Sequence, residues 1–217
     1  MIWGRVLSLL IGYAFGNILP GYLLAKHENV DLTKVGSGNV GSTNTMRALG
    51  PKKGFLTLAL DSLKCITAVF ITWLIFRFGF NVNPHIYMTY AGLGAVIGHD
   101  FPIALKFKGG KGIASTLGFA IALFPLGVPV AAVVFLLIVA ITRYVSLGSI
   151  IAVPLLCVQG IIFTALDMMA YEPSEKIEVY VICAIVSILA VALHHANIGR
   201  LIHHNERKLS FHPETRE

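Results

Sequence analysis

Three polar stretches interrupt a chain that is otherwise mostly apolar, and each of them carries groups that bind anions. They cover residues 34–47 (KVGSGNVGSTNTMR), 106–115 (KFKGGKGIAS) and 194–208 (HHANIGRLIHHNERK). Cationic side chains, amide groups and glycine-rich backbone are frequent ligands of phosphate groups. Apolar helices need none of these groups for their own stability, so we expect the three stretches to form a site.

The first stretch is a glycine-rich loop with hydroxyl and amide side chains that ends at an arginine. Its glycines satisfy the pattern GxGxxG, but a dinucleotide fold is excluded because the stretch lies between apolar segments rather than in a βαβ unit. An arginine offers phosphate two parallel hydrogen bonds, so the loop suits a phosphorylated or polyhydroxylated small molecule. A helix cap is the alternative, and it accounts for only one or two of these residues. The candidate ligands are Ser37, Asn39, Thr43, Asn44 and Arg47.

The second stretch places lysines and glycines directly before an apolar run that begins at Ile113. We expect its backbone N–H groups to lie at a helix N-terminus, which favours an anion. A Walker A loop is excluded, because Gly112 stands where serine or threonine would hold magnesium. A phosphate cradle is favoured over the alternative, a plain flexible loop. The candidate ligands are Lys108, Gly109, Gly110, Lys111 and Gly112.

The third stretch ends an apolar run and places His194, Asn197 and Arg200 on one face of a helix, because they are spaced by three residues. A metal site formed by the histidines at 194, 195, 203 and 204 is an alternative. No acid or cysteine completes that set, so we expect neither a metal nor another cofactor. The chain also lacks the GxSxG, HExxH and HxxxxD patterns, so the sequence gives no sign of a Ser-His-Asp triad or of an acyl-CoA acyltransferase motif.

Composition indicates a membrane protein. Apolar residues make up 56% of the 217 residues, charged residues 13%, and the mean hydropathy is +0.76. Thirteen of the 17 lysines and arginines lie in the three stretches, their neighbouring loops, the segment near Arg143 and the tail. The positive-inside rule then predicts a cytoplasmic C-terminus, an N-terminus outside, and a site that faces the cytoplasm.

The expected fold is an all-α bundle of about seven transmembrane helices, since about 20 apolar residues cross a bilayer. Prolines and a glycine break the long apolar run at 125–129. Whether 112–125 and 128–144 fully cross or are re-entrant stays open. We expect a single membrane domain over 1–208 and a short cytoplasmic tail at 209–217. The expected spans are 4–24, 54–78, 86–105, 112–125, 128–144, 147–168 and 177–196.

Two ionisable residues, Asp61 and Lys64, lie inside the second expected span and share a helix face. Each would cost about 2.5–3.5 kcal/mol at mid-bilayer on insertion scales, so they must pair or line a polar cavity. A structural ion pair and a wall of the site are equally compatible with this placement. The glycines at 94 and 98 are spaced for close helix packing, although such spacing is common.

The order of these motifs along the chain resembles that of the bacterial membrane acyl-phosphate:glycerol-3-phosphate acyltransferases. The matching segments run from one end of the chain to the other. They are GSGNVGSTNTMR at 36–47, DSLK at 61–64, GHDFP at 98–102, FKGGKG at 107–112, SLG at 146–148 and HHANIGR at 194–200. The resemblance implies catalytic roles for Ser37, Arg47, Ser146, His194 and Asn197, and phosphate binding by the loop at 108–112.

The resemblance also implies an activity: transfer of a fatty acyl group from acyl phosphate to the 1-hydroxyl of sn-glycerol 3-phosphate. The products would be lysophosphatidic acid and inorganic phosphate, at the first step of phospholipid synthesis in the bacterial cytoplasmic membrane. The expected partners are both substrates, membrane lipid and transient docking of the enzyme that supplies acyl phosphate, without nucleic acid. A membrane transporter for a phosphorylated or other anionic solute is the alternative, although transporter sites lie near the bilayer midplane.

Overall fold

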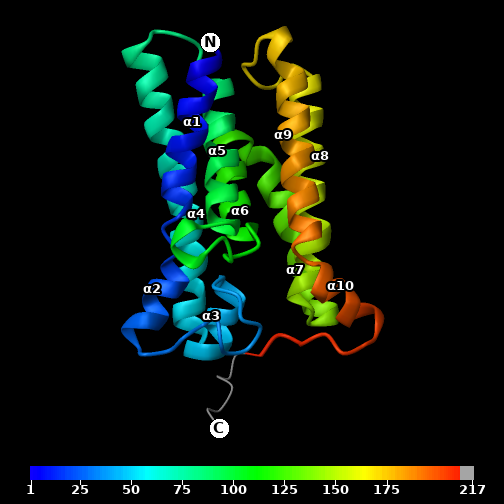
Figure 1. Cartoon of the computed structure of the whole chain (residues 1–217). Helices are drawn as coiled ribbons and strands as arrows, with labels where there is room; N and C mark the ends of the chain where they lie inside the picture. The colour runs from blue at the N-terminus through cyan, green and yellow to red at the C-terminus, as the bar shows by residue number, and fades with distance from the viewer. Residues whose placement is uncertain (211–217) are drawn as a thin grey trace.

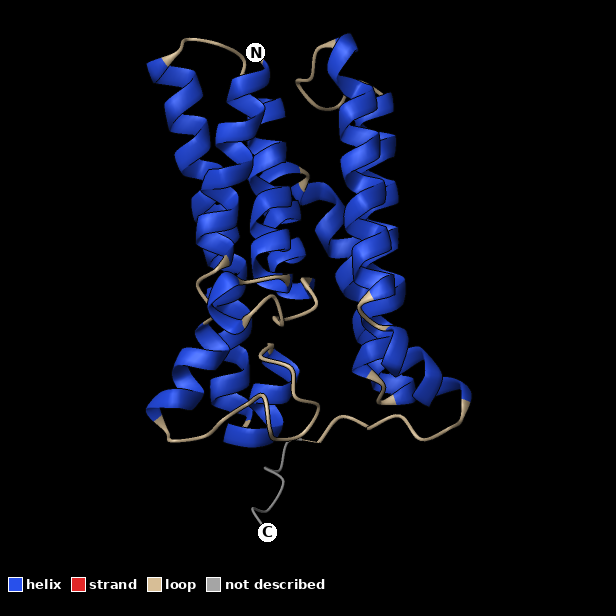
Figure 2. Ribbon diagram, in the orientation of Figure 1, coloured by secondary structure: helices blue, strands red, loops and turns tan. Residues whose placement is uncertain are grey.

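The computed structural model describes residues 1–210 as a bundle of helices that run along one long axis (Figure 1). These residues contain no strand (Figure 2), which confirms the all-α prediction. Leu209 and Ser210 are the described part of the expected tail, and its remainder, 211–217, lies outside the described residues.

The first half of the chain forms three long helical segments. Helices α1 (Ile2–Gly16) and α2 (Pro20–His27) follow each other with a short break. Pro20 begins α2 and carries no backbone N–H, so it cannot continue the hydrogen-bond ladder of α1. After the short α3 (Ser42–Leu49), α4 (Pro51–Leu74) continues into a π-helical turn, η1 (Ile75–Gly79). Helix α5 (His85–Asp100) returns along the bundle.

The second half begins with a short pair of helices. A 3₁₀ turn, η2 (Ile103–Leu105), leads toward α6 (Ile113–Leu123), and the expected break follows at η3 (Pro125–Gly127) before α7 (Val128–Thr142). In Figure 1 the turn between α6 and α7 lies well inside the height of the bundle, below the upper ends of α4, α8 and α9. The remaining elements are α8 (Val145–Ala165), η4 (Pro173–Glu175), α9 (Lys176–Ala192) and α10 (His195–Ile202).

The number of membrane spans is lower than expected when it is counted by helix length and hydropathy. Within residues 1–210, four helical segments are long and apolar enough to cross a membrane, and α9 with α10, bent by 52°, would make a fifth. Every predicted span has a helical counterpart. However, α5 has 16 residues and α6 has 11, which is short for a crossing of about 30 Å at 1.5 Å per residue. The structure supports a multi-pass membrane protein and leaves seven spans unconfirmed.

The predicted close helix contact at Gly94 and Gly98 is confirmed between α1 and α5. A Cβ atom on Gly94 would collide with the carbonyl oxygen of Leu9, and one on Gly98 with that of Tyr13. Gly12 and Gly16 present the matching face of α1 to Ala91 and Ala95. Small residues let the two backbones touch, which is how apolar helices associate without a hydrophobic driving force in lipid.

The three polar stretches lie toward one end of the bundle. Figure 1 shows α2, α3 and α10 at the lower end, opposite the N-terminus, and the loop before α6 directs its residues toward the same region. The fold therefore gathers stretches that are about 70 to 160 residues apart in the chain, as the separation of residues 39, 109 and 197 shows.

Candidate active site

A cavity of about 720 Å³ lies between α3, α4, α6, α7, α8 and α10. Its polar end is lined by residues from all three polar stretches. Its other end is apolar and is formed by α6, α7 and α8, with side chains such as Leu117, Phe135 and Leu156. One continuous space therefore offers a charged end and a hydrocarbon-like end.

Ten of the fourteen predicted site residues line this cavity. They are Ser37, Asn39, Thr43, Asn44, Arg47, Lys111, Ser146, His194, Asn197 and Arg200. The other four, Lys108, Gly109, Gly110 and Gly112, are not among the lining residues. Lys108 is exposed, whereas Gly110 and Gly112 are buried behind the cavity wall.

Asparagines hold the shape of the first loop. The carboxamide oxygen of Asn44 accepts a hydrogen bond from the Ser37 N–H at 2.9 Å, and its nitrogen donates to the carbonyl oxygens of Leu32 and Val35. Asn39 accepts from the Gly41 N–H at 2.9 Å and donates to the Gly109 carbonyl at 3.3 Å. Asn39 thereby ties the first polar stretch to the second. Helix α3 then carries Arg47, which is buried against the cavity.

Two glycines of the second stretch do not offer free backbone N–H groups to a phosphate. The Gly109 N–H donates to the Asp100 carbonyl at 3.0 Å, and the Gly110 N–H donates to the His99 carbonyl at 2.9 Å. These two N–H groups cap the C-terminal end of α5 and are already paired. Gly112, the N-cap residue of α6, has φ +70°, a left-handed conformation that suits glycine. The loop turns sharply here and directs Lys111 into the cavity.

A carboxylate organises the third stretch. Glu206 Oε1 accepts hydrogen bonds from Ser146 Oγ at 2.8 Å and from Asn197 Nδ2 at 2.6 Å, and Oε2 accepts from Arg200 Nε at 2.7 Å. The other end of the Asn197 carboxamide accepts a hydrogen bond from Lys111 Nζ. Glu206 thus connects α8, α10 and, through Asn197, the loop before α6.

The charges in this group shift each other's pKa. Burial lowers the pKa of Lys111 to about 8, and the nearby Arg200 and Arg47 act in the same direction, while Glu206 opposes them. Burial would raise the pKa of Glu206, but the hydrogen bonds from Asn197, Ser146 and Arg200 outweigh it and hold that pKa below its usual value. Glu206 therefore stays ionised at neutral pH and helps to keep Lys111 charged.

His194 has a defined orientation at the junction of α9 and α10. Its Nδ1 lies 2.6 Å from the Ala190 carbonyl oxygen, and a carbonyl only accepts, so Nδ1 carries the hydrogen. The ring is buried and lines the cavity. In the neutral imidazole the remaining nitrogen, Nε2, is then the proton acceptor.

Among the lining residues that were not predicted as site residues, Glu206 and His99 make contacts that hold the site. Glu206 is the only acidic residue within 194–208, and an isolated acid among cations was the available signal. His99 lies in the GHDFP segment, which carried no site of its own in the sequence interpretation. Its contact with the loop depends on how the end of α5 packs. Among residues 1–210, no group of three or more His, Cys, Asp or Glu is arranged to hold a metal ion.

These features define an integral membrane, all-helical protein with a cavity whose polar end is lined by Arg47, Lys111 and Arg200. The sequence profile of a family described as glycerol-3-phosphate acyltransferase matches residues 6–204. The chain belongs to this family.

Individual relatives agree with the family assignment. A glycerol-3-phosphate acyltransferase of Trichlorobacter lovleyi is 42% identical over 196 residues, which cover 90% of this chain and 93% of that protein. One of Thermotoga petrophila is 38% identical over 203 residues, covering 93% and 94%.

Solved structures show the same fold. The glycerol 3-phosphate form of PlsY (YgiH), an integral membrane glycerol 3-phosphate acyltransferase, superimposes with a TM-score of 0.79 at 34% identity. It covers 95% of this chain and 96% of that one. The lysophosphatidic acid form of the same protein gives a TM-score of 0.76 at 33% identity.

Proposed function

We propose that this protein transfers a fatty acyl group from acyl phosphate to the 1-hydroxyl of sn-glycerol 3-phosphate. The products are lysophosphatidic acid and inorganic phosphate. Family membership supports glycerol 3-phosphate as the acceptor. The observation that carries the proposal is the cavity itself, which joins a cationic end to an apolar end.

The cavity suits these two substrates because both carry phosphate and one carries an acyl chain. Arg47, Lys111 and Arg200 line the polar end and supply positive charge for phosphate. The apolar walls of α6, α7 and α8 suit a hydrocarbon tail, which stays out of water there. The scissile carbonyl would lie where these two environments meet.

The chemical step needs no covalent enzyme intermediate, since acyl phosphate is already activated. The C1 hydroxyl oxygen of glycerol 3-phosphate attacks the acyl carbonyl carbon and forms the new ester bond. The bond between that carbon and the bridging phosphate oxygen breaks, and phosphate leaves with the electron pair. The hydroxyl proton passes either to Nε2 of His194 or to a phosphate oxygen of the substrates.

The developing oxyanion requires hydrogen-bond donors near the carbonyl. Asn197 uses one N–H for Glu206 and retains a second, because an amide nitrogen carries two hydrogens. The Ser37 hydroxyl is the other candidate, since its backbone N–H is already donated to Asn44. A single such donor contributes about 2.7–4 kcal/mol in other enzymes. Ser146 acts through Glu206 in this scheme.

The proposal includes a location and a set of requirements. The protein spans the bacterial cytoplasmic membrane with its N-terminus outside and the cavity end in the cytoplasm, as charge asymmetry predicts. The reaction requires no metal and no other cofactor. The enzyme that supplies acyl phosphate docks transiently at the same end.

The direct test is to incubate purified protein with acyl phosphate and glycerol 3-phosphate and to measure lysophosphatidic acid and phosphate. Product is expected with acyl phosphate but not with acyl-CoA, and EDTA is expected to leave the rate unchanged. Product formed only from acyl-CoA would contradict the donor. Loss of activity in EDTA that zinc restores would contradict the mechanism. Uptake of glycerol 3-phosphate into proteoliposomes without product would favour the transporter alternative.

The proton acceptor can be identified with His194→Ala. If His194 is the base, the variant is expected to lose the acidic limb of the pH–rate profile along with most of kcat. An unaltered pH–rate profile assigns the proton to a substrate phosphate instead.

A further inference from the structure

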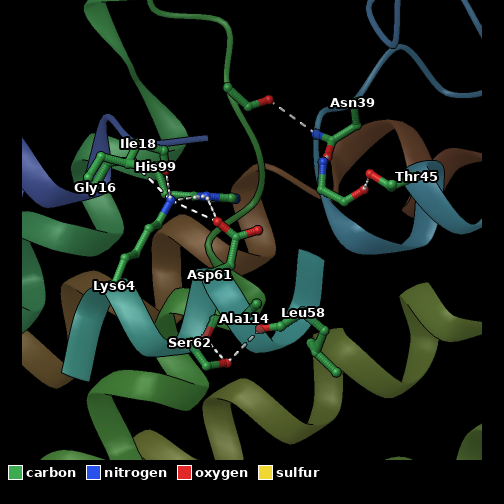
Figure 3. Close-up of polar contacts among 12 residues, drawn as sticks. Gly16, Ile18, Asn39, Thr45, Leu58, Asp61, Ser62, Lys64, His99 and Ala114 are labelled. Atoms are coloured by element: carbon green, nitrogen blue, oxygen red, sulfur yellow. Dashed lines mark hydrogen bonds and ion pairs between the residues drawn. The ribbon is translucent and has the colours of Figure 1, made fainter. Parts of the chain in front are cut away.

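A buried ionic cluster lies behind the second polar stretch, formed by Asp61 and Lys64 of α4 and His99 of α5. Their exposed fractions are 1%, 6% and 3%. Lys64 Nζ lies 2.8 Å from Asp61 Oδ1, and His99 Nδ1 lies 3.2 Å from the same oxygen. Figure 3 shows the three side chains converging between α4 and the end of α5.

The Lys64 ammonium has three hydrogen-bond contacts beside its ion pair with Asp61. Nζ donates to the carbonyl oxygens of Gly16 at 3.0 Å and Ile18 at 2.6 Å, and it lies 2.9 Å from His99 Nδ1 (Figure 3). The Gly16 carbonyl is available because Pro20, four residues later, has no N–H to donate. Lys64 therefore binds the break between α1 and α2 to α4.

The His99 ring contacts both members of the ion pair. Its Nδ1 lies 2.9 Å from Lys64 Nζ, within hydrogen-bond distance, and 3.2 Å from Asp61 Oδ1. The opposite nitrogen, Nε2, lies under Gly110, where a Cβ atom would collide with it.

His99 and its neighbour also hold the loop through their backbone. The carbonyls of His99 and Asp100 accept the N–H groups of Gly110 and Gly109, as described above. The Gly109 carbonyl in turn accepts from Asn39 of the first stretch. The contact path thus runs from the α1–α2 break through Lys64, Asp61 and His99 to the loop that carries Lys111.

The charges of the cluster also suit an anion site. Asp61 lines the cavity, and an uncompensated carboxylate there would repel phosphate. The Lys64 ammonium neutralises that charge at a distance of 2.8 Å.

We propose that Asp61, Lys64 and His99 are positioning residues that fix the loop at 109–112 and so set where Lys111 meets the substrate phosphate. The inference rests on the proposed function for the identity of that phosphate. None of the three needs to touch substrate, because their effect passes through Gly110 and Asp61 has its charge compensated.

The first test compares His99→Asn with Ser62→Ala. Asparagine retains a polar atom near the Nδ1 position but has no atom at the Nε2 position, so it removes the support under Gly110. Ser62 is the matched control: it is buried beside Asp61, donates to the Ala114 carbonyl at 2.9 Å and does not line the cavity. The measurements are the Kd for glycerol 3-phosphate by calorimetry, kcat, KM and thermal stability in detergent.

His99→Asn is expected to lower kcat/KM and weaken glycerol 3-phosphate binding by about 10- to 100-fold, the effect of misplacing a substrate contact by about 1 Å. Ser62→Ala is expected to reduce stability and leave both quantities within about twofold. Equal effects of the two variants, or loss of stability alone in His99→Asn, would overturn the proposal. Binding is measured without an acyl donor, so failure of acyl phosphate as donor would affect the proposed function and not this comparison.

A double-mutant cycle gives a readout that a purely structural role would not produce. Gly110→Ala alone collides with His99 Nε2, whereas asparagine at 99 leaves space for the new methyl group. The double variant is expected to bind glycerol 3-phosphate at least about fivefold more tightly than additivity of the two single variants predicts. Additive effects would overturn the proposal.

The ion pair is tested separately, because Asp61→Asn leaves the Lys64 charge buried and can prevent folding. The double variant Asp61→Asn with Lys64→Met removes both charges and is expected to fold. It retains an amide near His99 but loses the tie to the α1–α2 break, so glycerol 3-phosphate binding is expected to fall about tenfold or more. Wild-type binding by this folded variant would remove the ion pair from the network.

Discussion

Glu206 is the residue on which the third polar stretch depends, since Ser146, Asn197 and Arg200 all donate to its carboxylate. We predict that Glu206→Gln lowers kcat/KM by about 10- to 100-fold, because charge-assisted hydrogen bonds contribute about 1.5–3 kcal/mol. The matched control is Glu178→Gln at the opposite end of the bundle. Glu178 accepts hydrogen bonds from Arg5 and Tyr90, so its loss should reduce stability and leave kcat/KM unchanged. Steady-state kinetics and thermal unfolding of both variants test this prediction, and an equal loss of kcat/KM in the two variants would contradict it.

The pH dependence of unfolding at acid pH should depend on the ionisation of Glu206. The folded-state pKa of Glu206 lies below its usual value, so its stabilising contribution is complete above about pH 4.5 and is lost as the pH falls through the folded value. We predict that unfolding midpoints of the wild type and Glu206→Gln converge as the pH is lowered below this range. A constant difference between the two proteins would contradict this prediction.

Lys111 should set the alkaline limb of the pH–rate profile. Its pKa is lowered to about 8, so the ammonium charge is lost as the pH rises through that value. We predict that activity falls above about pH 8 and that Lys111→Arg removes this limb, because arginine stays charged. In Glu206→Gln the limb should move to lower pH, because the carboxylate no longer favours the charged lysine. An unchanged limb in Lys111→Arg would show that another group titrates.

At the residue scale, the sequence predicted which polar residues line the cavity better than it predicted the contacts that hold them in place. Arg47, Lys111, His194 and Asn197 were predicted from residue type and motif, and all four line the cavity. The partner of Ser146 was not predictable, since Glu206 lies 60 residues further along the chain and meets it only after α8 and α10 pack. The same holds for His99 under Gly110. Spacing within one helix shows shared faces, but not contacts between helices.

At the scale of elements, breaks were easier to predict than lengths. Proline and glycine marked the turn at Pro125–Gly127, and backbone chemistry enforces it. The start of α6 was placed correctly at Ile113. The expected span at 86–105 was too long, because α5 ends at Asp100 and its last carbonyls accept the N–H groups of Gly109 and Gly110. Hydropathy alone does not predict that backbone hydrogen bonds from a following loop end a helix.

The α1–α5 contact offers a test at the same scale. We predict that Gly94→Ala destabilises the protein by about 1–3 kcal/mol, because its Cβ would collide with the Leu9 carbonyl and the helices must separate. Gly79→Ala is the control, since a Cβ there meets no atom within 4 Å. Unfolding midpoints in one detergent compare the two variants. Equal unfolding midpoints for Gly94→Ala and Gly79→Ala would show that the α1–α5 contact tolerates a methyl group.

The whole molecule is polarised along its long axis. Helices α2, α3 and α10 lie at one end of the bundle and the N-terminus lies at the other (Figure 1), and residues of α3 and α10 line the polar end of the cavity. Under the proposed function, a polar end next to an apolar interior lets a water-soluble acceptor and a lipid-soluble donor reach one site from two phases. This arrangement has a functional consequence only if the polar end faces the compartment that contains the soluble substrate.

That orientation is our last prediction, and single cysteines test it. The three native cysteines, Cys65, Cys157 and Cys183, are buried and unpaired, so they are replaced first. Cysteine is then introduced at Lys34, at Lys108 or at Asn205, all of which are exposed at or beside the polar stretches. Lys108 is preferable to Gly110, because a side chain at Gly110 would collide with His99.

We expect these three positions to resist a membrane-impermeant thiol reagent in intact cells and to react after the cells are opened, because the positive-inside rule places them in the cytoplasm. Ser174→Cys is the matched control, since Ser174 is exposed in the loop before α9, at the opposite end of the bundle. It should react in intact cells. Labelling of Lys34→Cys, Lys108→Cys or Asn205→Cys from outside, with protection of Ser174→Cys, would reverse the orientation. The soluble acceptor would then have to reach the cavity from outside the cell, which is incompatible with a cytoplasmic acyl transfer.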